Sequence, residues 1–250
     1  MFSLRLHAPP AAKDELIAEL WEAGTAGIVD EEGAIRAFFE HSADPAALSA
    51  RFTPFRPELR EEPVVDWAEA TRDAWPPLEI GEHFFLVTPW CTDPAPPGRL
   101  RLIINPGMAC GTGRHPATQL ALEALERYVH PGDRVADIGT GSGILAAAAS
   151  LLGARQVIAC DIDLASVQVA AERLQTPVFA GSASAIRSGW AQVVIANIDS
   201  AAIEGLRAEF ERIRTPQSTL ILTGFPHWDK PEGYHPREAL RRDEWVSWIC

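Results

Sequence analysis

Three glycines stand close together in the segment Asp137-Ile-Gly-Thr-Gly-Ser-Gly-Ile-Leu145, which follows a short apolar run. Gly139, Gly141 and Gly143 have no Cβ atom, so the backbone can turn sharply and a ligand can approach the main chain. The alanine-rich stretch that follows predicts a helix, whose first N–H groups and positive dipole end face the same space. These residues therefore predict a binding loop for a nucleotide-like ligand.

Two carboxylates accompany the loop and decide between two classes of ligand. Asp137 directly precedes it, and Asp161 ends the next apolar run, about twenty residues after the first glycine. Dinucleotide sites favour the spacing G-x-G-x-x-G with a pyrophosphate at the helix terminus, whereas this chain has G-x-G-x-G behind a carboxylate that would repel pyrophosphate. S-adenosylmethionine carries an ammonium group and a ribose diol, which can donate hydrogen bonds to carboxylates. The residues therefore favour S-adenosylmethionine, with Asp161 holding the two ribose hydroxyls.

The chain around this loop alternates between apolar runs typical of buried strands and amphipathic runs typical of helices. Such alternation predicts a doubly wound α/β sheet, in which ligands bind at the carboxyl ends of the strands. Asn197 follows a strongly apolar strand and is expected at that edge, and Thr118 is expected to cap or open a helix. Strands are predicted over 83–88, 99–104, 177–180, 191–196, 218–223 and 243–249, with two more starting at 135 and 158; helices are predicted over 119–128, 164–174 and 200–214, with one more starting near 144.

The first third of the chain differs in character. Strands over 3–8, 27–30 and 34–39, with helices over 11–23 and 45–52, predict half or more of a ferredoxin-like α+β module. The following stretch is rich in proline and acids, with a helix predicted over 66–73, and is expected to connect two domains. The expected organisation is a small α+β docking domain at 1–55, a connector at 56–82 and a cofactor-binding catalytic domain at 83–250.

Composition and charge limit the classes of function. A chain of 250 residues with 47% hydrophobic content is long enough for one sizeable domain and a small one. Its net charge of −12 argues against a nucleic-acid binder and is compatible with a basic protein partner. The four cysteines stand far apart without a C-x-x-C spacing, so no metal site is expected. The N-terminus lacks a signal-peptide layout and no apolar run is long enough for a bilayer, so a cytoplasmic protein without a membrane partner is expected.

Three motifs occur together and in order: Asn105-Pro-Gly-Met-Ala-Cys-Gly-Thr-Gly-Arg-His-Pro-Ala-Thr118, the glycine loop with Asp161-Ile-Asp163, and Ala196-Asn-Ile198. Together they resemble the PrmA family, the methyltransferases of ribosomal protein L11. The first motif is the specific one, since many methyltransferases share the glycine loop. The resemblance implies a Rossmann-like, seven-stranded, mostly parallel sheet and the cofactor S-adenosylmethionine. It also implies cofactor contacts from Thr118, Gly139, Asp161 and Asn197.

The resemblance further implies a protein N-methyltransferase that modifies lysine side chains or the N-terminal amine of a large-subunit ribosomal protein. Asn197 is then expected to accept a hydrogen bond from the substrate amine, while its N–H₂ group meets the cofactor. His115 and Asp199 are candidates to assist removal of the amine proton. Two alternatives stay open: a methyltransferase of the same fold that acts on another protein lysine or a small amine, and a cofactor-binding interaction module that transfers no methyl group.

Several positions depart from the family pattern. Cys110, Ala117 and Asp199 stand where the family has an aromatic residue, a threonine and a leucine, and Gly181-Ser182 lacks the acid that often holds adenine. These positions lie toward the substrate more than toward the glycine loop, so they bear on the acceptor more than on the cofactor class.

Overall fold

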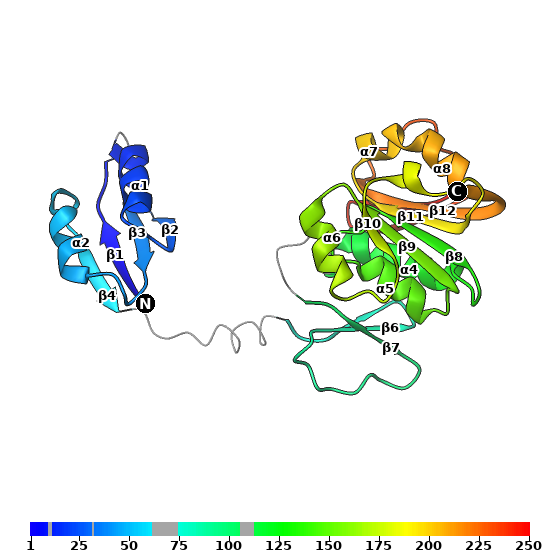
Figure 1. Ribbon diagram of the computed structural model, residues 1–250, viewed down its shortest axis with the longest axis horizontal. Helices are drawn as coiled ribbons and strands as arrows, with labels where there is room; N and C mark the ends of the chain where they lie inside the picture. Colours follow the sequence, from blue (N-terminus) through cyan, green and yellow to red (C-terminus); the bar gives the residue numbers. More distant parts are fainter. Residues whose placement is uncertain (10–11, 32, 62–74, 106–112) are drawn as a thin grey trace. The chain divides into compact units, whose positions relative to one another are not determined.

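The computed structural model describes residues 1–9, 12–31, 33–61, 75–105 and 113–250, and the chain divides into two compact units, Met1–Asp73 and Ala74–Cys250. Figure 1 draws both units. The predicted helix over 66–73 and the departure at Cys110 lie outside the described residues. Both ends of the expected connector belong to the units themselves. Strand β4 (Glu58–Glu61) pairs with β1 (Phe2–Leu6) in the first unit, and strand β5 (Leu78–Ile80) pairs with β6 (Phe84–Val87) in the second.

The first unit is an antiparallel sheet packed against two helices. Strands β1 (Phe2–Leu6), β2 (Gly27–Glu31), β3 (Ala34–Phe39) and β4 stand in the order β2-β3-β1-β4. Helices α1 (Lys13–Glu22) and α2 (Pro45–Arg51) add Leu16, Leu20 and Leu48 to a core that includes Leu4 and Leu6 of β1. This is the ferredoxin-like arrangement, and its fourth strand lies in the stretch expected to be a connector.

The second unit is built on a seven-stranded sheet in the order β10-β9-β8-β11-β12-β14-β13 (Figure 1). Neighbouring strands from β10 to β12 are parallel, whereas β14 is antiparallel to both β12 and β13. The strands are β8 (Arg134–Ile138), β9 (Gln156–Asp161), β10 (Val178–Ala180), β11 (Ala191–Asn197), β12 (Arg214–Pro226), β13 (Glu238–Arg242) and β14 (Trp245–Ile249). The predicted doubly wound, mostly parallel, seven-stranded sheet is therefore confirmed.

Helices cover both faces of this sheet, and alternate strand residues pack against each face. Val135 and Val193 join a core with α4 (Pro116–Tyr128) and α5 (Ile144–Leu151). Their neighbours Ala136 and Val194 join a second core with Ile203 of α7 (Ser200–Gly205) and Phe210 of α8 (Arg207–Ile213). A small sheet of β5, β6 (Phe84–Val87) and β7 (Leu100–Ile103) adds Phe84 and Leu102 to the first core. Within the described residues, no helix has both the length and the apolarity needed to cross a bilayer.

The strand order reverses between β8 and β11. The chain runs outward from β8 to β9 and β10, and then returns to pair β11 with the opposite side of β8. The glycine loop follows β8, and Asn197 ends β11. In doubly wound sheets ligands bind outside the carboxyl ends of the strands at such a switch point. The fold therefore brings the two predicted site segments to one place.

Besides β4 and β5, three elements differ from the sequence-based expectations. The edge strand β13 (Glu-Ala-Leu-Arg-Arg) was not predicted, since it has one large apolar residue and no alternating pattern. The helix predicted over 200–214 is two helices, because the backbone at Leu206 leaves helical geometry, with ψ near 2°. Helix α4 begins at Pro116, so Thr118 lies in its first turn instead of capping it.

Candidate active site

The glycine loop packs tightly against the segment that follows β11. Gly139, Gly141 and Gly143 have φ values of +73°, +52° and +79°, in the left-handed region that favours glycine. A Cβ on Gly139 would lie 2.4 Å from Cγ2 of Ile198, the residue after Asn197. The absence of a side chain at 139 therefore allows the loop to touch the end of β11.

Asp137 lies completely buried beneath the loop. Its Oδ2 accepts hydrogen bonds from the Thr140 hydroxyl at 2.6 Å and from the Ala146 amide at 3.1 Å. Ala146 belongs to the first turn of α5, so the carboxylate pairs with one of the N–H groups that a helix leaves unsatisfied at its start. Its Oδ1 is buried and has no hydrogen-bond partner, and burial raises the pKa of Asp137 to about 6. One oxygen thus folds the loop, while the other remains for a donor.

Asp161, at the end of β9, is held by backbone amides on two sides. Its Oδ2 accepts from the N–H of Gly141 at 2.9 Å, and its Oδ1 accepts from the N–H of Asp163 at 3.0 Å. A carboxylate offers about four lone-pair positions, so two further hydroxyl donors can bind. The carboxylate expected to hold ribose is therefore fixed to the glycine loop. Asp163 itself caps helix α6 (Leu164–Ala171), because its carboxylate accepts from the amides of Ala165 and Ser166.

Asn197 and Thr118 lie far apart in sequence and meet at the carboxyl edge of the sheet. The Nδ2 of Asn197 donates to the Thr118 hydroxyl at 3.2 Å, and Thr118 is almost completely buried. Since the N–H₂ group points to Thr118, the amide oxygen of Asn197 is the atom left to accept a hydrogen bond from a ligand. Next to Asn197, Thr223 of β12 donates to the carbonyls of Ala117 and Val246. The start of α4 is thus fixed to the strands beside β11.

His115 and Asp199, the two candidates for moving a proton, both cap helices. The Nδ1 of His115 accepts from the Ala117 amide at 3.3 Å at the start of α4, and its ring lies 4.4 Å from that of Trp245. A neutral imidazole that accepts at Nδ1 carries its proton on Nε2, so His115 is placed to donate a hydrogen bond. Asp199 accepts from the Ala202 amide at 2.9 Å at the start of α7. These contacts give both residues a structural role.

Gly113 and Arg114 were not singled out from the sequence, yet they position the start of α4. Gly113 has φ +79°, and a Cβ there would lie 2.6 Å from Leu86 Cδ2 and 2.8 Å from Ile144 Cδ1. Arg114 stacks over the ring of Trp75 at 5.0 Å and donates to the carbonyl of Pro76. Gly113, just before α4, thereby lies close against Ile144, the first residue of α5. The signal in the sequence was the second glycine of Gly-Thr-Gly-Arg-His.

Two exposed apolar side chains follow Asp161, and sequence reasoning missed them. Ile162 is 85% exposed and Leu164 is 59% exposed. An apolar side chain left in water beside a ribose acceptor suits the face of an adenine ring. The signal was an apolar residue between the two acids of Asp161-Ile-Asp163. The family pattern instead places an acid near Gly181, which this chain lacks.

The residues present fit S-adenosylmethionine. Asp137 offers a buried, unpaired oxygen for a cationic donor, and Asp161 offers a fixed carboxylate for a diol. Between them the glycine loop leaves its backbone free of side chains at three positions. The arrangement can bind a ligand that combines an ammonium group with a ribose.

Comparisons with known proteins identify the family of the chain. The family model described as Ribosomal protein L11 methyltransferase (PrmA) matches residues 3–246. A ribosomal protein L11 methyltransferase of Thermus thermophilus is 32% identical over 260 residues, and the match covers 98% of each chain. One of Geobacillus thermodenitrificans is 36% identical over 209 residues, which cover 77% of this chain and 66% of the relative. The solved structure of a ribosomal protein L11 methylase from Lactobacillus delbrueckii subsp. bulgaricus is similar with a TM-score of 0.63 and 26% identity, covering 69% of this chain and 96% of that chain.

The family match spans both units and includes the glycine loop, Asp161 and Asn197. The resemblance inferred from the sequence motifs is therefore confirmed, together with the class of enzyme and of cofactor. The chain belongs to the ribosomal protein L11 methyltransferase (PrmA) family of S-adenosylmethionine-dependent methyltransferases.

Proposed function

We propose that this chain methylates amino groups of ribosomal protein L11, on lysine side chains or on the N-terminal amine. The observation that carries this proposal is the hydrogen bond between Asn197 and Thr118 at the carboxyl end of β11. It leaves the amide oxygen of Asn197 to accept a hydrogen bond, at a strand end whose next residue, Ile198, touches Gly139 of the glycine loop. An acceptor amine would meet the cofactor there. The names of the relatives support ribosomal protein L11 as the substrate, and a ribosomal substrate is consistent with the expected cytoplasmic location.

Each cofactor-binding role falls to a residue whose chemistry suits it. Asp161 would bind the ribose hydroxyls, Asp137 would face the ammonium group through Oδ1, and Ile162 would pack against adenine. Thr118, Gly139, Gly141 and Gly143 would form the backbone and side-chain surface against which the cofactor lies. S-adenosylmethionine supplies a methyl group on a positively charged sulfur, which an uncharged amine can attack directly.

The amide oxygen of Asn197 would hold the acceptor amine by accepting a hydrogen bond from one of the amine's N–H groups. A lysine amine in water has a pKa near ~10.4, so it must lose its proton before it can act as a nucleophile. Removing the amine from water favours its uncharged form, and a fixed acceptor orients the lone pair. Because His115 is placed to donate, we assign proton removal to desolvation and solvent instead of to a dedicated base.

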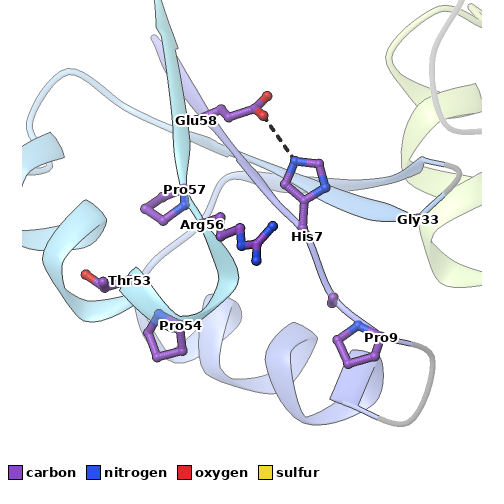
Figure 2. A pocket seen from close by; sticks show the side chains of 9 residues that line it. His7, Pro9, Gly33, Thr53, Pro54, Arg56, Pro57 and Glu58 are labelled. Carbon is purple, nitrogen blue, oxygen red and sulfur yellow. Dashed lines mark hydrogen bonds and ion pairs between the residues drawn. The ribbon is translucent and has the colours of Figure 1, made fainter.

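The first unit would dock the protein substrate. It contains 7 Lys and Arg against 15 Asp and Glu, which is −8 of the net charge of −12. A cavity of about 760 Å³ opens between β1, β4 and the turn before β4, where His7 faces Glu58 with 3.1 Å between Nε2 and Oε1 (Figure 2). Prolines and charged side chains line this cavity, and such a surface suits a polypeptide. The acidic charge favours a basic partner.

Transfer of a labelled methyl group tests this function. The full chain would be incubated with labelled S-adenosylmethionine and separated large-subunit ribosomal proteins, and the modified residues mapped by mass spectrometry. We expect label on ribosomal protein L11, and a loss of roughly 10²-fold in kcat/KM for Asn197→Ala, since the amine is no longer oriented.

Gln192→Ala is a matched control, because Gln192 is an amide residue of the same strand at its opposite end, bonded to the Arg134 amide. We expect Gln192→Ala to keep its activity. Label on another protein alone would replace the proposed substrate, and cofactor binding without label on any acceptor would favour a binding module over an enzyme.

A further inference from the structure

We infer that Trp228 forms the binding surface for the lysine side chain of the acceptor, beside Asn197. The inference rests on the proposed function and names the residue that recognises the acceptor. Trp228 follows the carboxyl end of β12 and is 68% exposed, which is unusual for so large an apolar side chain.

The position of Trp228 is determined by the segment that follows β11. A Cβ on Gly224 would lie 2.4 Å from the carbonyl oxygen of Ile198, so the two segments touch directly after the paired residues Asn197 and Thr223. Two residues beyond Ile198, the hydroxyl of Ser200 donates to Oδ2 of Asp229 at 2.7 Å. The segments 197–200 and 223–229 therefore run side by side. Trp228 sits at the end of this contact, on the same edge of the sheet as Asn197.

The other side of Trp228 is supported by His227. The two rings pack edge to face with centroids 4.7 Å apart. The backbone N–H of His227 donates to the carbonyl of Glu244 at 2.8 Å, and Pro226 pairs with Trp245, which in turn packs on His115. The exposed indole is therefore mounted on the sheet edge, and a rigid aromatic surface loses little freedom on binding.

The charges around Trp228 suit a cation. Asp199, Asp229 and Glu244 lie on the segments that contact one another here. The stretch 226–233 contains a single lysine, Lys230. An ammonium group is attracted to an indole face, and the aliphatic stem of a lysine can pack on the same ring. A lysine whose stem lies on Trp228 would direct its amine toward the strand end that carries Asn197.

Steady-state kinetics of the full chain test this inference with Trp228→Phe and Trp228→Leu. We expect Trp228→Leu to raise KM for the acceptor protein roughly 10-fold and Trp228→Phe by less than ~3-fold, because Phe retains an aromatic face. The kcat and the cofactor affinity should stay close to wild type. Leu151→Ala is the control, since Leu151 is an exposed apolar residue at the far end of α5. Equal KM values in all variants would overturn the inference.

A second measurement keeps the inference independent of the identity of the acceptor. The protein saturated with S-adenosylhomocysteine would be titrated with an N-acetylated peptide containing one lysine, and with its acetyl-lysine counterpart. We expect a fluorescence change for the lysine peptide that is present in wild type and absent in Trp228→Phe. If no ribosomal protein is methylated but the fluorescence change occurs in wild type alone, only the proposed function fails. If wild type and Trp228→Phe respond alike to the lysine peptide, Trp228 does not bind lysine.

Discussion

At the scale of single residues, Asp161 joins the proposed cofactor site to the fold. Its two oxygens already accept backbone N–H groups from Gly141 and Asp163, so its orientation does not depend on a ligand. We expect Asp161→Asn to weaken S-adenosylmethionine binding roughly 10- to 100-fold, because the ribose hydroxyls lose a charged acceptor. Calorimetric titration measures this. Asp163→Asn, two residues away on a helix cap, should leave the affinity nearly unchanged.

Asp137 gives the stability of the second unit a distinct pH dependence. Burial raises the pKa of its carboxyl from 3.8 to about 6, while bonds from Thr140 and Ala146 oppose the shift and the charge of Asp161 adds to it. The folded state therefore binds the proton more tightly than the unfolded chain. The stabilisation is complete below pH ~4 and is lost as the pH rises through ~6, a change on the order of 3 kcal/mol.

Urea unfolding of wild type and Asp137→Asn at a series of pH values measures this contribution. We expect the free energy of unfolding of wild type, relative to the variant, to fall between pH ~4 and ~6 and then to level off. The subtraction removes carboxyls of opposite behaviour, such as Asp163, whose pKa is lowered by bonds from Ser166 and Ala165. A difference that does not change with pH would show that Asp137 titrates normally.

At the scale of elements, the glycine loop depends on a contact as well as on backbone geometry. Gly139→Ala would place a Cβ in the left-handed region and 2.4 Å from Ile198. We expect destabilisation of about 2–4 kcal/mol, since both strain and overpacking contribute, together with weaker cofactor binding. Gly98→Ala is the matched control, because Gly98 has φ +82° with nothing near its missing Cβ. Thermal unfolding of the two variants separates the contact from the strain.

The elements that form the site were largely predictable from the sequence, since buried parallel strands are nearly continuous apolar runs. The strands that carry Asp137, Asp161 and Asn197 near their carboxyl ends were therefore found, together with the loop between β8 and α5. The edge strand β13 was missed because a polar strand at a sheet edge has no core to mark it. Strand β4 was missed for a similar reason, because all four of its residues are exposed.

Contacts between distant segments were not predictable. Thr118 was expected to cap or open a helix, and it lies in the first turn of α4, but its hydroxyl bond from Asn197 was not foreseen. The sequence before Thr118 did not indicate that His115 would cap α4. Likewise, Trp228 carried no signal until the contacts of Gly224 with Ile198 and of Asp229 with Ser200 showed where it lies. Spacing in the sequence locates a strand end but does not tell which other segments reach it.

At the scale of the whole molecule, we propose that the first unit docks the substrate and the second binds the cofactor. Removing residues 1–73 takes away −8 of the net charge and the docking cavity, but no residue of the glycine loop. We expect the truncated chain to bind S-adenosylmethionine within about 2-fold of wild type and to lose at least ~10²-fold in kcat/KM for the protein substrate. Calorimetry and labelled methyl transfer measure the two properties.

The full chain provides a check on the same idea without truncation. If acidic charge attracts the substrate, KM for the protein should rise as salt is added, because the Debye length falls from about 10 Å at 0.1 M to about 3 Å at 1 M. The affinity for the cofactor, which is bound by a few buried groups, should change much less. Full protein methylation by the truncated chain would contradict the docking role.

The hydrogen bonds that Asp161 accepts and the one that Asn197 donates also bear on how this chain would change in evolution. Asp161 ties two backbone segments together, whereas Asn197 donates to a single hydroxyl. A lineage released from selection for methyl transfer could lose Asn197 with little effect on folding, but loss of Asp161 would loosen the glycine loop as well. Descendants that have become inactive would therefore still carry the cofactor signature, and a sequence motif alone would continue to describe them as methyltransferases.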